Sequence, residues 1–415
     1  MDILRITTAG SVDDGKSTLI GRLLYDTRSI TKDKLEAIEA TSKRKGLDFT
    51  DLSLLTDGLI AEREQGITID VAHIYFSTAN RKYIIADSPG HVEYTRNMIT
   101  GSSNADVSLI LIDARKGVIE QTKRHFYIAS LLRIKEVVVC INKMDLVDHN
   151  ETVFNSIKND FESIVSRAGF EGQQIKYIPM AARDGDNIVF SSTALHWYKG
   201  EPLLDYLENI GVSADNDKGP ARFPVQYIIR PHTDEFHDFR GYAGKVESGL
   251  FKKGEEVVVL PSFKTAKIKS LHVYNNEKEE VQAKQTVVIT LEEDIDISRG
   301  NMLFKCANKF QQRTELNATV CWMEESPGVE GKIYLLQHGT NRVKAKLSAI
   351  KQVLDIESLE AKDQKRSFGL NDIGDVSLKL AKPIFADTYN ENPANGSFIL
   401  IDEFSNNTVA VGFVR

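Results

Sequence analysis

GSVDDGKS, residues 10–17, fits the phosphate-binding pattern G-x-x-x-x-G-K-[ST]. A strand-like run precedes it at residues 3–8, and a helical pattern follows it at residues 17–25, which is the context that this pattern requires. Glycines let backbone N–H groups turn toward a phosphate, and the helix N-terminus favours the negative charge. The Lys16 ammonium can neutralise β- and γ-phosphates, and the Ser17 hydroxyl can bind Mg²⁺. The sequence therefore predicts a P-loop rather than an ordinary strand–helix turn.

The same alternation of apolar strands and helical patterns continues to about residue 210 and predicts an α/β domain with a doubly wound, mostly parallel sheet. Further strands are expected at 82–86, 107–113, 136–142 and 175–180, and helices at 92–100, 121–132 and 151–168. A polar linker follows at 211–221, and short strands with glycine turns then predict antiparallel β-barrels. We expect three domains: the P-loop domain over 1–212 and two β-barrels over 213–308 and 309–415.

In the first barrel, strands are expected at 223–230, 242–248, 255–260, 266–274 and 286–291. In the second barrel, they are expected at 315–323, 332–336, 340–353, 374–380, 396–401 and 407–413. Each run is short and β-prone, and turn residues separate it from the next run.

The composition excludes several classes of protein. A chain of 415 residues with 41% hydrophobic and 27% charged residues is typical of a multidomain globular protein. The net charge of −7 weighs against a nucleic-acid-binding role. Three widely spaced cysteines fit a reducing compartment and argue against a disulfide framework or a Cys₄ zinc site. The N-terminus has no signal-peptide pattern and no run approaches a membrane span, so a cytoplasmic protein without a membrane partner is expected.

Two further elements follow the P-loop. Asp87 begins a D-x-x-G pattern at a strand end, where its carboxylate can hold Mg²⁺ through water and Gly90 can offer an N–H to the γ-phosphate. Thr68 lies between these motifs, and its hydroxyl could complete the Mg²⁺ coordination only when the γ-phosphate is present. Taken alone, D-x-x-G is weak evidence and Thr68 reads as a β-forming residue at the start of a strand over 68–76. Both gain value from their place after the P-loop.

NKMD, residues 142–145, ends a buried strand and predicts guanine recognition. Asp145 can accept hydrogen bonds from both the N1–H and the 2-amino group of guanine, a pattern that adenine does not supply. Asn142 can bond the base edge and tie this loop to the P-loop, and the Lys143 stem can cover the flat face of the ring. After the next strand, Ala181 and Ala182 can offer a backbone N–H to the guanine O6.

With these elements in place, residues 1–210 resemble the translation-factor class of GTPases. Longer runs resemble one family within it, the GTPase subunit of bacterial sulfate adenylyltransferase: the P-loop with its helix over 10–24, the run DLSLLTDGLIAEREQGITIDVA over 51–72, and NGSFILID over 395–402. Elongation factors more usually have His where Ser11 and Asp14 stand, and Thr where Ser17 stands. Ala181 departs from the family, which commonly has Ser there; because the expected contact is made by backbone, nucleotide binding should survive.

The resemblance implies GTP and Mg²⁺ as cofactors, with hydrolysis of GTP driving the formation of adenylyl sulfate and pyrophosphate from ATP and sulfate on a smaller partner subunit. It also implies that His91 orients the attacking water; the chemistry of a neutral imidazole permits this role. The expected catalytic residues are Lys16, Thr68, Gly90 and His91, and the expected metal ligands are Ser17, Thr68 and Asp87. The expected nucleotide-binding residues are Gly10, Ser11, Val12, Asp13, Asp14, Gly15, Lys16, Ser17, Thr18, Asp87, Asn142, Lys143, Asp145, Ala181 and Ala182.

Two other functions share these features. An elongation-factor-like GTPase that binds aminoacyl-tRNA would have the same domains, but the acidic charge, Asp14 and the run over 396–402 favour the sulfate enzyme. A GTP-dependent assembly scaffold would bind GTP without hydrolysing it. Two histidines and three acids at 232–238 invite a metal site, but a solvated hairpin tip is the better interpretation because they lack a recognised ligand spacing.

Overall fold

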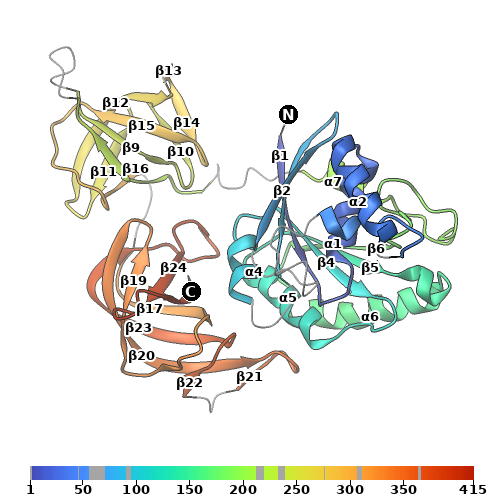
Figure 1. The fold of residues 1–415 in the computed structure, drawn as a ribbon. Coiled ribbons are helices and arrows are strands. Elements are labelled where there is room, and N and C mark those ends of the chain that lie inside the picture. The colour runs from blue at the N-terminus through green and yellow to red at the C-terminus, as the bar shows by residue number, and fades with distance from the viewer. Residues whose placement is uncertain are drawn as a thin grey trace. The chain divides into compact units, whose positions relative to one another are not determined.

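The computed structural model describes residues 2–44, 46–55, 71–89, 95–211, 219–231, 239–274, 276–305, 311–362 and 366–415. The chain forms two compact units, one of residues 1–212 with 355–360 and one of residues 213–354 with 361–415. Figure 1 shows the fold of both units. No helix within these described ranges is long and apolar enough to cross a membrane.

The first unit contains a six-stranded sheet in the order β2-β3-β1-β4-β5-β6. Its strands are β1 (Ile3–Ala9), β2 (Ala72–Ser77), β3 (Lys82–Asp87), β4 (Val107–Asp113), β5 (Glu136–Asn142) and β6 (Gln174–Pro179). Neighbouring strands run parallel except β2, which pairs antiparallel with β3 at the edge. All seven residues of β4 are buried, as is typical of a central strand covered on both faces.

Helices cover both faces of this sheet. They are α1 (Lys16–Asp26), α2 (Lys32–Arg44), α4 (Thr95–Ser102), α5 (Glu120–Leu131), α6 (Glu151–Ala168) and α7 (Leu203–Asn209), with 3₁₀ turns η1 (Leu52–Leu55) and η3 (Met144–Val147). Leucines of α1 and α7 share one core with the sheet. On the other face α5 lies beside α6, and the Phe126 and Phe161 rings meet edge to face at 5.1 Å (Figure 1). The doubly wound α/β prediction is confirmed.

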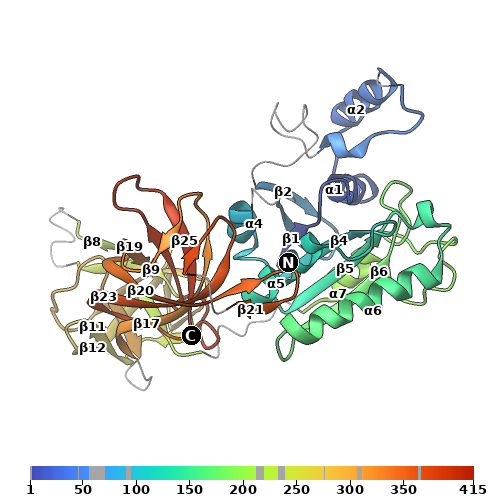
Figure 2. The ribbon, with the colours of Figure 1, turned by 90° about the horizontal axis from the view of Figure 1, so that it is seen from below.

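Two helices of this unit escape the sequence analysis. α2 has thirteen residues, most of them charged or polar, and its large apolar side chains are limited to Leu35 and Ile38. Figure 2 shows α2 at the end of the unit that lies away from α6. α7 is seven residues long, too short for a helical period to stand out. Of the expected strand over 68–76, residues 68–70 lie outside the described residues, Val71 is irregular, and β2 extends from Ala72 to Ser77.

The second unit is built from antiparallel strands around two separate buried clusters. The first group comprises β7 (Arg222–Pro224), β8 (Tyr227–Ile229), β9 (Gly241–Lys245), β10 (Leu250–Lys252), β11 (Glu256–Leu260), β12 (Lys264–Val273), β13 (Asn276–Lys278), β14 (Glu280–Gln282), β15 (Thr286–Leu291) and β16 (Met302–Lys305). Its main sheet has the order β7-β16-β11-β12-β15-β9-β8. The expected single strand over 223–230 is wrong, because the chain divides there into β7 and β8, which stand at opposite ends of this order. Pro224 lacks an N–H and cannot extend the ladder.

The second group comprises β17 (Gln312–Trp322), β18 (Gly328–Val329), β19 (Ile333–His338), β20 (Asn341–Asp355), β21 (Glu360–Lys362), β22 (Ser367–Phe368), β23 (Ile373–Phe385), β24 (Ser397–Ile401) and β25 (Thr408–Val414). The order β19-β24-β25-β17-β23-β20-β21 closes on itself through the pairing of β19 with β20. The α/β domain followed by C-terminal β-barrels is therefore confirmed. The predicted domain bounds at 212 and 308 stay a prediction.

A buried ion pair joins the two groups of strands. Arg222 in β7 donates from Nε and Nη2 to the two carboxylate oxygens of Asp387, each at 3.0 Å. The Arg222 side chain is 1% exposed, and its guanidinium lies 4.0 Å from the ring centroid of Phe304. Asn392 and Asn395 also donate to Asp387 Oδ2, at 3.0 and 2.8 Å. Because both charges are buried, breaking this pair would leave an uncompensated charge inside the protein.

Candidate nucleotide site

The P-loop connects β1 to α1, and its conformation depends on glycine. Gly15 has φ of 94°, in the left-handed region that glycine adopts without strain. A Cβ placed on Gly15 would lie 2.4 Å from the Asn142 amide nitrogen. Gly15 is therefore required both by its backbone angle and by the close approach of Asn142, the first residue of the NKMD segment over 142–145, called the guanine loop below.

Lys16 is buried inside the loop that it completes. Its side-chain ammonium donates to the carbonyl of Gly10 at 2.7 Å and to that of Ser11 at 3.4 Å. Burial lowers the pKa of Lys16, and the negative charges of Asp87, Asp14 and Asp13 oppose that shift. A cation held in this way by backbone oxygens is well placed to meet the phosphates of a nucleotide.

Asp87 lies at the carboxyl end of β3, beside the start of the P-loop. Thr8 donates from its hydroxyl to Asp87 Oδ1 at 2.9 Å, and the two residues are paired in the parallel register of β1 and β3. The Asp87 carboxylate is almost completely buried. The Asp87 carboxylate and the Ser17 hydroxyl are oxygen donors of the kind that Mg²⁺ prefers, so the chemistry of these residues fits the ion.

Asn142 joins the guanine loop to two other segments. Its amide nitrogen donates to the Asp14 carbonyl at 2.8 Å, and its amide oxygen accepts from the Ala182 N–H at 2.9 Å. The predicted link between the NKMD loop and the P-loop is therefore present in the structure. The Ala182 N–H is thus already bonded to Asn142. The predicted contact of an Ala181 or Ala182 N–H with guanine O6 stays a prediction.

Asp145 lies in the turn η3, with its side chain 13% exposed. Its Oδ2 is 3.2 Å from Arg183 Nη2, and Arg183 also bonds to the neighbouring Asp184. Ala181 is fully buried.

The structure brings most of the predicted site to one edge of the sheet. Residues 10–18, Asp87, Asn142 and Lys143 all stand at or just beyond the carboxyl ends of β1, β3 and β5, where parallel sheets bind ligands. Thr68, Gly90 and His91 lie outside the described residues. The 232–238 hairpin tip also lies outside them, and the remaining, described part of the chain holds no cluster of three or more His, Cys, Asp or Glu that could bind a metal.

Sequence reasoning missed one charged residue of this edge. Asp113 ends β4, and its side chain has no exposed surface. It contacts Arg115 and Lys143, and the adjacent Lys116 approaches the Asp14 carboxylate at 3.8 Å. The available signal was an acid that ends a fully apolar strand within a parallel sheet, which is the position where ligand-binding residues gather.

Burial gives Asp14 a testable pH dependence. Its carboxylate accepts from the Ser11 N–H at 2.6 Å, yet burial raises the pKa of Asp14 to about 6 from the ordinary 3.8. The folded chain therefore binds a proton between pH about 6 and 4 that the unfolded chain does not bind. The free energy of unfolding should fall as the pH rises through this window, by up to about 3 kcal/mol from this group.

We expect Asp14→Asn to remove this component, so that the gain in melting temperature relative to the parent protein is larger at pH 7.5 than at pH 5. Thermal unfolding without nucleotide at both pH values measures the difference. Asp13→Asn is the matched control, because Asp13 is its exposed neighbour in the same loop. An equal difference at the two pH values would contradict the expectation.

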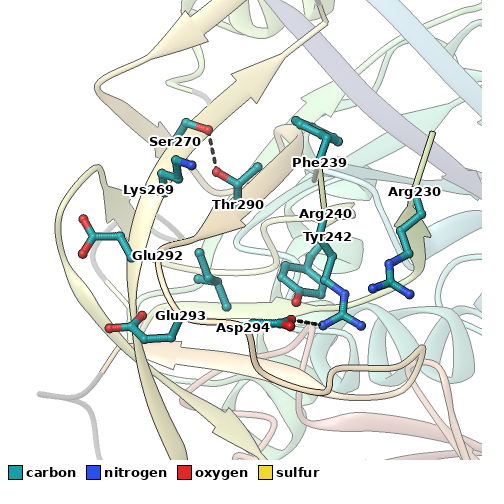
Figure 3. A pocket seen from close by; sticks show the side chains of 11 residues that line it. Arg230, Phe239, Arg240, Tyr242, Lys269, Ser270, Thr290, Glu292, Glu293 and Asp294 are labelled. Atoms are coloured by element: carbon teal, nitrogen blue, oxygen red, sulfur yellow. Dashed lines mark hydrogen bonds and ion pairs between the residues drawn. The ribbon is translucent and has the colours of Figure 1, made fainter. Parts of the chain in front are cut away.

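A cavity of about 480 Å³ lies apart from these residues, in the first group of antiparallel strands (Figure 3). Arg230, Arg240 and Lys269 line it together with Glu292, Glu293 and Asp294, so its wall carries both signs of charge. Arg240 pairs with Asp294, and the hydroxyls of Ser270 and Thr290 are 2.6 Å apart. No P-loop or guanine-loop residue lines this cavity, and the chemistry above does not involve it.

Comparison with known proteins agrees with this geometry. Residues 1–213 match the family model of the elongation factor Tu GTP-binding domain, and residues 315–415 match that of the GTP-eEF1A C-terminal domain-like family. The fold and the site therefore define a GTP-binding protein of the translation-factor GTPase class.

Full-length relatives narrow the class. Sulfate adenylyltransferase subunit 1 of Bacteroides fragilis is 48% identical over 415 residues, which cover 100% of this chain and 86% of that protein. The same subunit of Cellvibrio japonicus is 47% identical with the same coverage. The bifunctional enzyme CysN/CysC of Mycobacterium tuberculosis is 47% identical over 413 residues, or 99% of this chain and 67% of that protein. The chain belongs to the sulfate adenylyltransferase subunit 1 family.

Proposed function

We propose that this chain is the GTP-hydrolysing subunit of a sulfate adenylyltransferase and takes part in sulfate assimilation. Identity of 46–48% with proteins named as subunit 1, over the full length of the chain, carries the assignment. The geometry supports its GTPase part, because Asn142 ties a complete P-loop to the guanine loop. The chain converts GTP and water to GDP and phosphate, while a smaller subunit makes adenylyl sulfate and pyrophosphate from ATP and sulfate. We propose that both subunits act in the cytoplasm.

In this proposal each part of the site has one task. Lys16 and the backbone N–H groups of the P-loop bind the phosphates, and Asp145 selects guanine. Ser17, Asp87 and Thr68 are proposed to hold Mg²⁺, which would neutralise the β- and γ-phosphate oxygens when bound. His91 orients the attacking water, with the Gly90 N–H directed to the γ-phosphate. The roles of Thr68, Gly90 and His91 rest on the family resemblance.

The first experiment asks what the chain assembles with. Affinity-purified protein from cells that synthesise sulfur-containing amino acids from sulfate should carry a smaller subunit in a stable complex. The complex should form adenylyl sulfate faster when GTP is added. If the purified chain instead binds aminoacyl-tRNA in a GTP-dependent manner and lacks the sulfate activity, the elongation-factor alternative replaces this proposal.

His91→Ala separates an enzyme from a non-hydrolysing scaffold. We expect the rate of phosphate release at saturating GTP to fall about 10²-fold, because a positioned general base or water-orienting group contributes an effect of this order. GTP affinity should change less than twofold. His196→Ala, which alters an exposed histidine, is the control and should hydrolyse GTP normally. Negligible phosphate release by both the parent complex and the variants would favour the scaffold.

A further inference from the structure

Asp113 lies where the P-loop, the guanine loop and the turn after β4 come together. It is the last residue of β4, and in the parallel register of β4 and β5 it is paired with Asn142, the first residue of NKMD. Its side chain is fully buried. Burying a charged carboxylate costs free energy unless the carboxylate is paired. The neighbouring strand ends therefore place an ionisable group directly beside the guanine loop.

Both oxygens of the Asp113 carboxylate are used, and they have different partners. Oδ1 accepts from the backbone N–H and from Nε of Arg115, each at 3.0 Å. Oδ2 accepts from Arg115 Nη2 at 2.6 Å and lies 3.1 Å from Nζ of Lys143. Burial acts to raise the pKa of Asp113, but hydrogen bonds from Arg115 and Lys143 outweigh it and hold the pKa below its usual range. The carboxylate therefore stays charged.

Lys143 is held at two points. Its ammonium pairs with Asp113 and also donates to the Asp13 carbonyl of the P-loop. Its backbone has φ of 63°, an uncommon conformation for a residue other than glycine and one that clusters at functional sites. With the Cα and the ammonium both fixed, the four-carbon stem between them has little freedom left to rotate. These contacts set the direction of the stem.

We propose that Asp113 is a positioning residue for guanine recognition: by anchoring the Lys143 ammonium, it directs the Lys143 stem across the face of the guanine ring. This inference rests on the proposed GTP-binding function and adds to it a residue outside the G-x-x-x-x-G-K-[ST], D-x-x-G and N-K-x-D motifs. Asp113 acts through Lys143 and does not itself touch the nucleotide.

A purely structural role for Asp113 would be to form the turn that follows β4. The main-chain carbonyl of Asp113 does accept from the N–H groups of Lys116 and Gly117, at 2.9 and 3.0 Å. The turn requires that carbonyl and the Oδ1 contacts with Arg115. It does not require the contact of Oδ2 with Lys143, and that contact is the one that reaches into the guanine loop.

The test compares Asp113→Asn with Arg115→Ala in the complex with the smaller subunit. Asparagine keeps an acceptor for the Arg115 N–H but removes the charge that holds Lys143. We expect the Kd for GTP to rise about tenfold in Asp113→Asn, the size typical of coupling between contacting residues, with kcat at saturating GTP unchanged. Arg115→Ala, which removes the other partner of the same carboxylate, should change the Kd less than threefold.

Inorganic tripolyphosphate, which has no base, distinguishes positioning from collapse of the site. Used as a competitor of GTP, it should bind Asp113→Asn and the parent protein equally well. If Asp113→Asn weakened tripolyphosphate binding by the same factor as GTP binding, Asp113 would support the P-loop as a whole, and the inference would be overturned. A parent complex that fails to bind GTP in preference to ATP would instead refute the proposed function.

Lys143→Met completes a double-mutant cycle, since methionine keeps an apolar stem without the ammonium. If Asp113 acts through Lys143, the double variant should bind GTP no more than about tenfold more weakly than the parent, like each single variant. Losses that multiply to about a hundredfold would mean that the two residues act independently, which contradicts the inference. Lys143→Met also provides the measurement if Asp113→Asn fails to fold, because its tripolyphosphate affinity should then be normal while GTP binding is weakened.

Discussion

Lys16→Ala is expected to reduce GTP hydrolysis by at least about 10³-fold, because it removes a preorganised cation from the phosphate where charge develops in the transition state. The geometry makes this cation hard to replace. Its ammonium is buried and held by the carbonyls of Gly10 and Ser11, so water entering the variant cannot supply a fixed positive charge there. Single-turnover release of phosphate from bound GTP measures the effect without interference from product release.

Lys116→Ala is the matched control for this prediction. Lys116 lies against the same loop, with Nζ 3.5 Å from the Val12 carbonyl and 3.8 Å from the Asp14 carboxylate, but its side chain is 42% exposed. Removing an exposed charge of this kind should change hydrolysis less than threefold. If Lys16→Ala retained more than a tenth of the parent rate, the P-loop lysine would not have the role proposed here.

Asp145→Asn should weaken GTP binding about 10³-fold and remove most of the preference for GTP over ATP. The carboxylate is expected to accept two hydrogen bonds from guanine, and a site built for such bonds discriminates strongly when a partner is lost. An asparagine amide offers one oxygen and presents its nitrogen to a donor of the base. Equilibrium titration with a fluorescent GDP, followed by competition with GTP and ATP, gives both affinities.

Asp184→Asn provides the control for Asp145. Both acids contact Arg183, at 3.2 Å for Asp145 and 2.9 Å for Asp184, but only Asp145 belongs to the NKMD motif. The Asp184 variant should keep its guanine preference. A similar loss in both variants would assign the effect to the arginine pair rather than to contact with the base, and an Asp145→Asn protein that still prefers GTP would contradict the role of Asp145.

The α/β fold was predictable because its central strands are apolar throughout. The predicted limits of β4, β5 and α6 coincide with those in the structure, since β4 and β5 are short, almost continuous apolar runs and α6 shows a helical period over its whole length. α2 was missed for the opposite reason, because its sequence is mostly charged and polar and has only two large apolar side chains. The division of 223–230 into β7 and β8 depends on which strands the chain pairs with, and a local pattern does not contain that information.

Site residues were predictable where they belong to one contiguous sequence motif, and not where residues from several loops come together in space. The P-loop and NKMD are contiguous motifs, and the bond from Asn142 to the P-loop is present as predicted. Asp113 has no motif around it, and its role depends on the parallel register that places it beside Asn142. The acid at the end of an apolar strand marks its position in the sequence, but its partners follow only from the strand register.

The buried pair of Arg222 and Asp387 has a consequence for recombining these proteins. Each group of antiparallel strands contributes one charge of the pair, so a chimera that takes either group alone from a relative lacking its half would bury an uncompensated ion. Residues 219–305 and 311–415 should therefore be exchanged together, as a single cassette. An experiment that replaces only one barrel should keep Arg222, Asp387 and Asn395 at their positions in the chimera.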